Sequence, residues 1–144
     1  TTVGRTPDEV AAILAGIPAG LRARAGYGLD TCHLYASGYD LARDAHAVRE
    51  TLDAFQAATG EPPGFFHLND SEGALGSNRD RHRLIGEGHL GEAPFAALLA
   101  DPRSHGVPLV LETPHAVDEP AEDDPTPDAH DVAMLALLRR LAAA

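Results

Sequence analysis

Residues 78–82 read NRDRH and place an aspartate and a histidine two positions apart, with an arginine on either side of the aspartate. In an extended segment, side chains two positions apart point the same way, so Asp80 and His82 can face a single metal ion. Arg79 and Arg81 could then bind a negatively charged group such as a phosphate. A solvated run of charges in a loop is the simpler interpretation, and the rest of the sequence has to decide between the two.

Further metal-binding side chains occur near the carboxyl ends of three segments that we predict to be β-strands. In chain order they are Asp30, His33, His67 and Glu112. The carboxyl ends of parallel strands meet at one edge of a sheet, which is where α/β folds place their active sites. Together with Asp80 and His82, these nitrogen and oxygen donors suit Zn²⁺, with Mn²⁺ or Fe²⁺ as alternatives. Six donors are more than one tetrahedral ion needs, so more than one ion is expected.

The elements that must position these side chains alternate along the chain. Strands are predicted at about 26–34, 64–70 and 107–112, and helices at about 6–17, 41–59, 92–100 and 129–141. Residues 6–9 (TPDE) form a capping box with proline in the first turn, and Gly60 ends the second helix. The order αβαβαβα predicts an α/β fold with about three parallel strands and four helices. Three strands cannot close a barrel, so exposed sheet edges are expected. The run VPLVLE (107–112) is typical of a strand buried on both faces.

Composition limits the class of protein. The 144 residues suffice for one domain, and no apolar run approaches membrane-spanning length, so no membrane association is expected. Cys32 is the single cysteine, which excludes an internal disulfide and favours a reducing compartment such as the cytoplasm. The net charge of −11 argues against nucleic-acid binding through a basic surface. Much of this charge lies in the acidic, proline-rich stretch at 115–128, which we interpret as an exposed loop.

Three segments resemble the endonuclease IV family, the zinc-dependent apurinic/apyrimidinic endonucleases of base excision repair. They read LDTCHLYASGYDL (29–41), FHLNDSEGALGSNRDRHRLIGEGHLG (66–91) and PLVLETP (108–114), and they occur in the order and spacing of that family. The resemblance implies a (β/α)8 TIM barrel of which residues 1–144 form the carboxyl-terminal part, with the loop at 115–128 unmatched. It also implies three zinc ions and hydrolysis of the phosphodiester 5′ to abasic sites in DNA, leaving a 3′-hydroxyl.

The resemblance further implies a role for each candidate residue. His33, Asp80 and His82 would be the complete ligand set of one zinc. Asp30, His67 and Glu112 would be three catalytic-site ligands of a second, with Arg79 and Arg81 contacting DNA phosphates. The remaining ligands, a bridging glutamate and two histidines, would lie upstream of the first residue, together with the first five strands. A complete barrel needs about 250 residues. We therefore expect little cleavage by this chain without the amino-terminal half. Glu72 stands where the family commonly has lysine, which weakens local attraction for phosphate.

Two other functions stay open at this point. One is a sugar isomerase or epimerase of the xylose isomerase type, whose barrel also gathers carboxylates and histidines around divalent metals. The pair Asp80 and His82 favours the endonuclease, because a further metal triad is not expected in the isomerases. The other is a non-catalytic metal-binding fragment that assembles with a chain supplying the missing half. The metal content of the purified chain is a direct test of the triad His33, Asp80 and His82.

Overall fold

A parallel three-stranded sheet stands at the centre of the computed structural model, which describes residues 3–116 and 126–143. Its strands are β1 (Gly28–Asp30), β2 (Phe65–His67) and β5 (Leu109–Val110), in the order β1-β2-β5. Gly28 pairs with Phe65 and Asp30 with His67, so the first two strands end level with each other. The predicted α/β fold with an incomplete barrel is confirmed, because these three strands are parallel and do not close on themselves.

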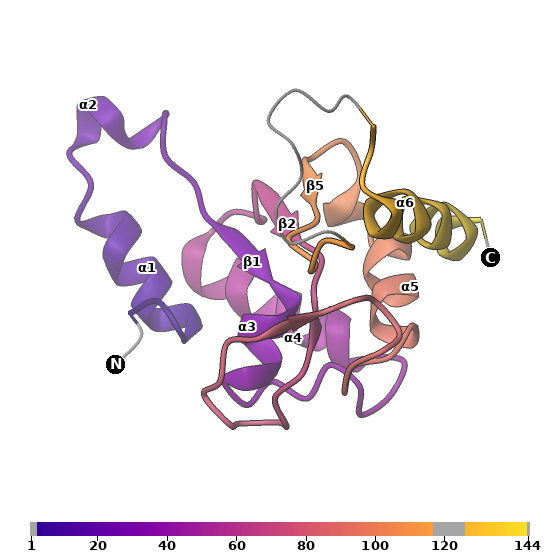
Figure 1. Cartoon of the computed structure of the whole chain (residues 1–144). Helices are drawn as coiled ribbons and strands as arrows, with labels where there is room; N and C mark the ends of the chain where they lie inside the picture. Colours follow the sequence, from indigo (N-terminus) through magenta and orange to yellow (C-terminus); the bar gives the residue numbers. More distant parts are fainter. Residues whose placement is uncertain (1–2, 117–125, 144) are drawn as a thin grey trace.

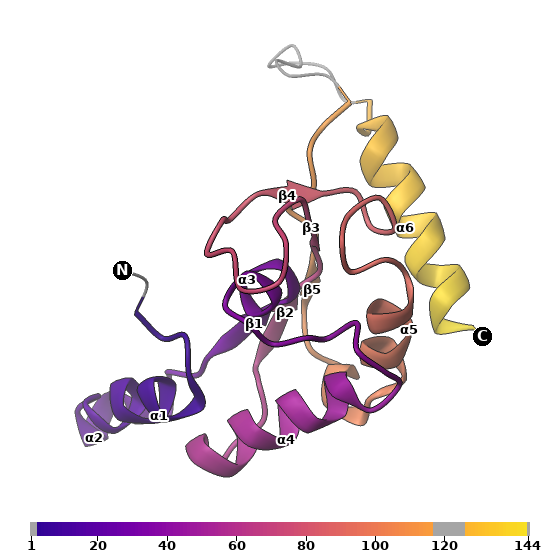
Figure 2. The ribbon, with the colours of Figure 1, turned by 90° about the horizontal axis from the view of Figure 1, so that it is seen from below.

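Helices cover the outer side of this sheet. The chain contains α1 (Pro7–Ala15), α2 (Ala19–Arg22), α3 (Thr31–Ala36), α4 (Ala47–Thr59), α5 (Ala93–Ala100), a 3₁₀ turn at Pro102–Ser104 and α6 (Ala129–Ala142). Seen from below, α4, α5 and α6 form an arc around the strands, and neighbouring helices of the arc pack on each other (Figure 2). Helices α1 and α2 project to one side, with α1 packed against α4 (Figure 1). Two short helices, α2 and α3, are thus added to the four that the sequence predicts.

The predicted helix ends are largely those observed. Thr6 Oγ1 accepts from the Glu9 amide at 3.2 Å, and the Glu9 carboxylate accepts from the Thr6 amide at 3.3 Å, so the capping box begins α1. Gly60 ends α4 with a φ of 78° in the left-handed region, where glycine is favoured. The start of α4 is a correction, because the helix begins at Ala47 and not at about residue 41. Asp44 Oδ1 accepts from the amides of His46 and Ala47, which holds the preceding residues in turns.

Two predictions about strands are wrong. Residues 31–34 do not run from β1 into a loop but begin α3, because Asp30 Oδ1 accepts from the His33 amide at 2.9 Å and caps a helix there. Strand β5 is not buried on both faces, since Leu109 and Val110 are 39% and 38% exposed. It forms an edge of the sheet beside β2, so its side chains are only partly covered.

The long polar segment after β2 is not irregular throughout. It contains a short antiparallel pair, β3 (Asp70–Ser71) and β4 (His82–Arg83), which turns the segment back over the carboxyl ends of the sheet. Residues 117–125 of the predicted acidic loop lie outside the described part of the chain.

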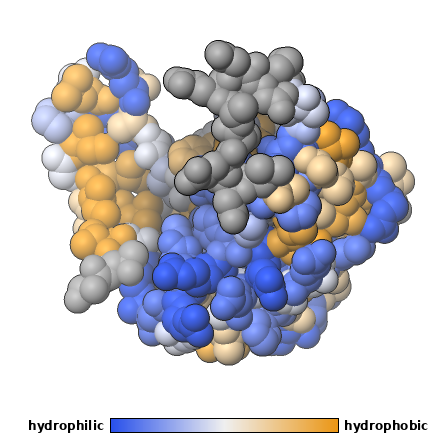
Figure 3. All heavy atoms as spheres, viewed as in Figure 1, coloured by the Kyte–Doolittle hydropathy of each residue, from blue (hydrophilic) through white to orange (hydrophobic). Residues whose placement is uncertain are grey.

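The main core fills the space between the sheet and the helical arc. Its most completely buried large side chains are Leu52, Phe55, Phe66, Leu68 and Phe95. Apolar surface is also exposed over α1 and α2, where Ile13 and Leu21 are about half exposed (Figure 3). Within the described residues, no helix combines the length and apolar character needed to cross a bilayer.

Candidate metal centre

The carboxyl ends of the strands bring the predicted ligands together. Asp30 and His67 are the last residues of β1 and β2 and are register partners, so their side chains lie side by side. Glu112 follows β5, and His33 lies in the first turn of α3. His82 begins β4, which the β3–β4 pairing places over the same edge.

The first group of possible ligands consists of Asp30, His67 and Glu112. His67 Nδ1 lies 2.7 Å from Glu112 Oε2 and 3.6 Å from Asp30 Oδ2. One donor atom from each residue lies within 4.8 Å of the others, which is a separation that a single ion can span. Asp30 is 8% exposed at its side chain and Glu112 is 46% exposed, so the group runs from the interior to the surface.

The second group consists of His33, Asp80 and His82. The Asp80 carboxylate lies between two imidazoles, with Oδ2 at 2.8 Å from His33 Nε2 and Oδ1 at 3.2 Å from His82 Nε2. These three residues also place one donor atom each within 4.8 Å. Burial lowers the pKa of His33, but the hydrogen bond to Asp80 and the negative charges of Asp30, Asp80 and Glu112 outweigh it and raise the pKa.

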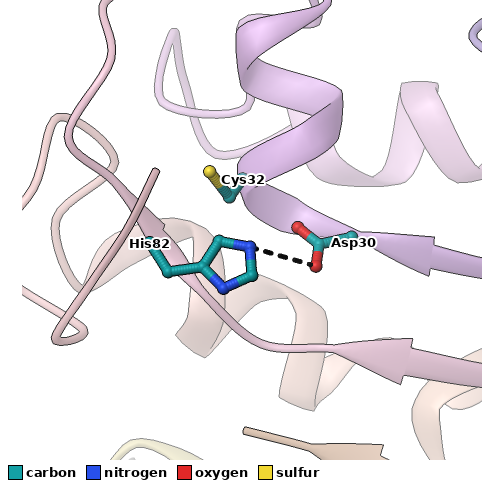
Figure 4. Close-up of side chains that lie close together, drawn as sticks. All are labelled: Asp30, Cys32 and His82. Carbon is teal, nitrogen blue, oxygen red and sulfur yellow. Dashed lines mark ion pairs between the residues drawn. The ribbon is translucent and has the colours of Figure 1, made fainter. Parts of the chain in front are cut away.

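Asp30 connects the two groups. Its Oδ2 atom lies 3.6 Å from His67 Nδ1 in the first group and 3.9 Å from His82 Nε2 in the second. Figure 4 shows the Asp30 carboxylate and the His82 imidazole facing each other, with Cys32 beside them. Cys32 completes a third possible group with these two residues, which the sequence did not suggest to us. Burial raises the pKa of its thiol, partly offset by hydrogen bonds to Ser71 and the Arg81 carbonyl, so the neutral form is favoured.

The tautomer of His82 follows from its surroundings. His82 Nδ1 lies 2.9 Å from the Glu112 carbonyl oxygen, which can only accept, so Nδ1 carries the proton. In the neutral ring, Nε2 then presents a lone pair toward carboxylate oxygens of Asp80 and Asp30. This nitrogen is buried and has no hydrogen-bond partner among the described residues. Acceptors that face one another without a donor call for a cation between them, so this donor set fits a divalent metal such as zinc.

Asn69 holds the first group from behind, a role that the sequence analysis missed. It is fully buried, its Nδ2 donates to Asp30 Oδ2 at 2.9 Å, and its Oδ1 accepts from the Glu112 amide at 3.0 Å. Thr31 Oγ1 in turn accepts from the Asn69 amide and donates to the Asn69 carbonyl. One amide side chain therefore links the ends of β1 and β5 across the end of β2. The available signal was an amide side chain shortly after the apolar residues of a predicted strand, where burial would require partners.

Asp70 is also fully buried, but it holds a loop and does not face the two groups. Its carboxylate accepts from the amides of Ser71, Gly86, Gly88, Leu90 and Gly91 at 2.7–3.2 Å. Gly88 approaches so closely that an added Cβ would lie 2.4 Å from Asp70 Oδ1. Asp70 thereby fixes residues 86–91 in the segment that continues from β4.

The remaining candidates lie at the surface. Arg79 is 65% exposed and lies 3.8 Å from Glu72 Oε1, whereas Arg81 donates from Nη1 to the Asp80 carbonyl at 2.8 Å. Both therefore flank the second group from outside. The exposed His89 and His115 join none of the possible metal groups in the described part of the chain. A cavity of about 390 Å³ opens beside the two groups, with Arg5, Asp30, His33, Phe65, His67 and Asp80 in its lining.

Comparison with known proteins places this chain in a family. Residues 1–138 match the model of the xylose isomerase-like TIM barrel family. A probable endonuclease 4 of Streptomyces avermitilis is 43% identical over 99 residues, which cover 68% of this chain and 32% of the relative. An apurinic-apyrimidinic endonuclease of Caenorhabditis elegans is 39% identical over 118 residues, covering 78% of this chain and 28% of the relative. The crystal structure of endonuclease IV from Thermus thermophilus superposes with a TM-score of 0.75 at 34% identity, over 99% of this chain and 45% of that one. The chain thus spans less than half the length of these relatives.

Proposed function

This chain belongs to the xylose isomerase-like TIM barrel family, in its endonuclease IV branch, and we propose that it forms the metal-binding carboxyl-terminal part of a DNA-repair endonuclease. The substrate is DNA with abasic sites, and the bond hydrolysed is the phosphodiester on their 5′ side. Such a role also agrees with the cytoplasmic location that we predict. The observation that carries the proposal is the buried Nε2 of His82, which lies between the Asp80 and Asp30 carboxylates and has no hydrogen-bond donor or acceptor assigned to it among the described residues.

The two ligand groups have different parts in this proposal. His33, Asp80 and His82 form a complete ligand set for one zinc, with Mn²⁺ as an alternative. Asp30, His67 and Glu112 supply three ligands of a second, whose site is completed by residues outside this chain. Zinc bound there would lower the pKa of a coordinated water and stabilise the leaving oxygen of the phosphodiester. Asp30 serves both groups, because its Oδ2 faces His67 and His82.

Other residues orient the ligands and the substrate. The Glu112 carbonyl fixes the His82 ring through Nδ1, and Asn69 fixes Asp30 and the backbone of Glu112. Arg79 and Arg81 lie at the surface beside Asp80, where their guanidinium groups can contact DNA phosphates. An abasic nucleotide has no base to unstack, so it costs less to turn out of the duplex than an intact one.

The second group favours this reaction over sugar isomerisation. An isomerase of the same fold needs carboxylates and histidines around its metal pair, but not the additional set of His33, Asp80 and His82. The alternative of a metal-binding fragment without activity of its own is compatible with the same geometry. It differs from the endonuclease only once a complementary half is present.

Elemental analysis of the purified chain tests the metal centre. We expect about one tightly held zinc per chain, because the second group is complete and the first is not. His82→Ala should abolish it. His46→Ala is the matched control, since this exposed histidine lies at the start of α4 and belongs to no ligand group in the described residues. A chain without zinc after purification and zinc dialysis would contradict the proposed centre.

Nicking assays test the reaction. We expect little or no cleavage of abasic duplex by this chain alone, and chelator-sensitive cleavage when it is co-expressed with the part of a bacterial endonuclease IV that it lacks. His82→Ala should remove the restored activity and His46→Ala should retain it. Robust nicking by the isolated chain would contradict our expectation that it is incomplete. A co-expressed complex that binds zinc but never cleaves would favour the non-catalytic alternative.

A further inference from the structure

The aromatic ring of Phe65 lies next to the first ligand group, two residues before His67 on β2. Phe65 and His67 are two positions apart on β2, and their register partners on β1 are Gly28 and Asp30. Side chains two apart along a strand share a face, so Phe65 lies on the face that carries His67. It also lines the cavity that opens beside Asp30, His33 and His67.

The Phe65 ring lies across β1 at Gly28. A Cβ atom added to Gly28 would lie 2.2 Å from Phe65 Cζ, so no residue other than glycine leaves room for the ring in this position. The ring also contacts His67, with centroids 5.3 Å apart and planes tilted by 48°. This is a favourable arrangement for a pair of aromatic rings.

Phe65 contributes little to the main core. It is 39% exposed, and it is not among the buried residues that form the core cluster of the described chain. Its neighbour Phe66, which points to the other face, is 1% exposed and does belong to the core. The position of Phe65 is therefore better explained by the residues on its own face than by packing of the core.

His67 needs support of this kind because its polar contacts are all on one nitrogen. Both Glu112 and Asp30 approach Nδ1, and no hydrogen bond to its other ring nitrogen is found among residues 3–116 and 126–143. His82 is different, since the Glu112 carbonyl holds Nδ1 and leaves Nε2 for a ligand. Metal-binding histidines usually have such a fixing contact on the far side of the ring.

We propose that Phe65 is the positioning residue for His67, and that Gly28 is required because it makes room for the Phe65 ring. The tilted ring beside it keeps His67 directed toward Asp30 and Glu112 and gives the cavity an apolar wall beside them. The inference rests on the proposed metal centre where it concerns metal affinity. Where it concerns the orientation of His67, it can be tested on the metal-free chain.

Metal titration of variants tests the effect on affinity. Calorimetry and the visible spectrum of Co²⁺, added in excess, would follow the tight second group and then the weaker, incomplete first group. We expect Phe65→Ala to weaken binding at the Asp30, His67 and Glu112 group by about tenfold, while the His33, Asp80 and His82 group keeps its affinity. Phe65→Tyr, which keeps the ring, should restore the wild-type affinity and spectrum. Leu135→Ala, at a 45% exposed position on α6, is the remote control.

The Gly28 contact provides a second, independent comparison. Gly28→Ala should weaken the same group to a similar extent, because the new methyl group displaces the Phe65 ring. In the Phe65→Ala background the methyl group has no ring to displace, so Gly28→Ala should add little further loss. If Gly28→Ala reduced metal affinity as much in the Phe65→Ala background as in the unsubstituted chain, the proposed relationship would be overturned. An equal loss of affinity at both ligand groups would also overturn it.

Nuclear Overhauser effects in the metal-free chain separate this inference from the proposed function. Contacts from the His67 ring to Asp30 and Glu112 side-chain protons should persist in Phe65→Tyr and disappear in Phe65→Ala. Their persistence in Phe65→Ala would overturn the role of Phe65, whether or not metal binds. A wild-type chain that shows these contacts but takes up no metal would instead overturn the metal centre and leave the positioning of His67 supported.

Discussion

The side chain of Asn69 joins Asp30 to Glu112, donating to the Asp30 carboxylate at 2.9 Å and accepting from the Glu112 amide at 3.0 Å. These two ligands come from opposite edges of the sheet, and Asn69 lies at the end of the strand between them. The relationship makes one buried amide responsible for the spacing of the first ligand group.

Asn69→Ala should therefore weaken both metal binding and the fold. Loss of two buried hydrogen bonds should lower the free energy of unfolding by roughly 1–3 kcal/mol. Zinc affinity at the first group should fall by about 10- to 100-fold, as for other residues that orient metal ligands. Urea denaturation and zinc titration of the same preparation would measure the two effects. An unchanged zinc affinity would show that Asp30 and Glu112 hold their positions without Asn69.

Asp70→Asn tests the buried carboxylate that fixes residues 86–91. The substitution replaces one acceptor oxygen with a donor that faces backbone amides, so we expect a loss of about 3 kcal/mol of stability. Asp8→Asn, at an exposed position in the first turn of α1, should change stability by no more than about 0.5 kcal/mol. Equal midpoints for the two variants in urea would exclude a structural role for Asp70.

Gly88→Ala should destabilise the same loop through a steric clash. The added Cβ would meet Asp70 Oδ1 at 2.4 Å and the Ser71 carbonyl at 2.5 Å. These two oxygens accept hydrogen bonds from the amides of Leu90 and His89, so moving either one would disturb the loop. Gly20→Ala is the matched control, because nothing lies within 4 Å of its new methyl group. It should be neutral or stabilising by up to about 1 kcal/mol. Thermal unfolding would reveal a lower midpoint for Gly88→Ala alone.

The stability of the chain should depend on pH through Asp101. Hydrogen bonds from Arg103, partly opposed by burial, hold the pKa of this carboxyl below its usual 3.8. A carboxyl with a lowered pKa stabilises the fold fully above its unfolded-state value and loses this contribution as the pH falls through its folded-state value. Asp101→Asn should therefore cost on the order of 1–3 kcal/mol at pH 7 and progressively less below about pH 3.8.

Asp53→Asn serves as the comparison for Asp101→Asn. Asp53 also binds Arg103, at 2.7 Å, but its side chain is 63% exposed, so its removal should cost less than about 1 kcal/mol. Urea denaturation at neutral and acidic pH measures both variants. The difference in free energy of unfolding between Asp101→Asn and the unsubstituted chain should shrink at low pH. A difference that stays constant would rule out a stabilising role for the ionised Asp101 carboxylate.

Much of the fold could be predicted from the sequence because its signals are local. The capping box of α1 and the glycine that ends α4 depend on neighbouring residues only, and both are confirmed. The burial of β5 could not be read from its apolar run, because burial depends on which elements lie beside a strand. The helix after β1 was missed for a related reason, since Asp30 was placed at a strand end that runs into a loop, and its carboxylate in fact begins α3.

The same distinction between local and long-range signals applies to the candidate site. The candidate ligands that the structure brings together could be named from residue type, from their places at strand ends and from the spacing of Asp80 and His82. The contacts behind them could not, because Asn69 and the Glu112 carbonyl act across the sheet between residues 30 or more positions apart. Phe65 gave no signal at all in the sequence, since an aromatic residue in a strand is ordinarily interpreted as core.

The two oxygens of Asp30 have separate tasks, with Oδ1 on the amide of His33 and Oδ2 toward the imidazoles. One carboxylate therefore both begins α3 and links the two ligand groups, so we expect the start of this helix and the arrangement of the ligands to depend on each other. The amide proton of His33 is bonded to Asp30 Oδ1, so its rate of exchange with solvent depends on the position of the Asp30 carboxylate. Measuring this exchange rate would therefore report whether the ligand groups have formed, without any substrate.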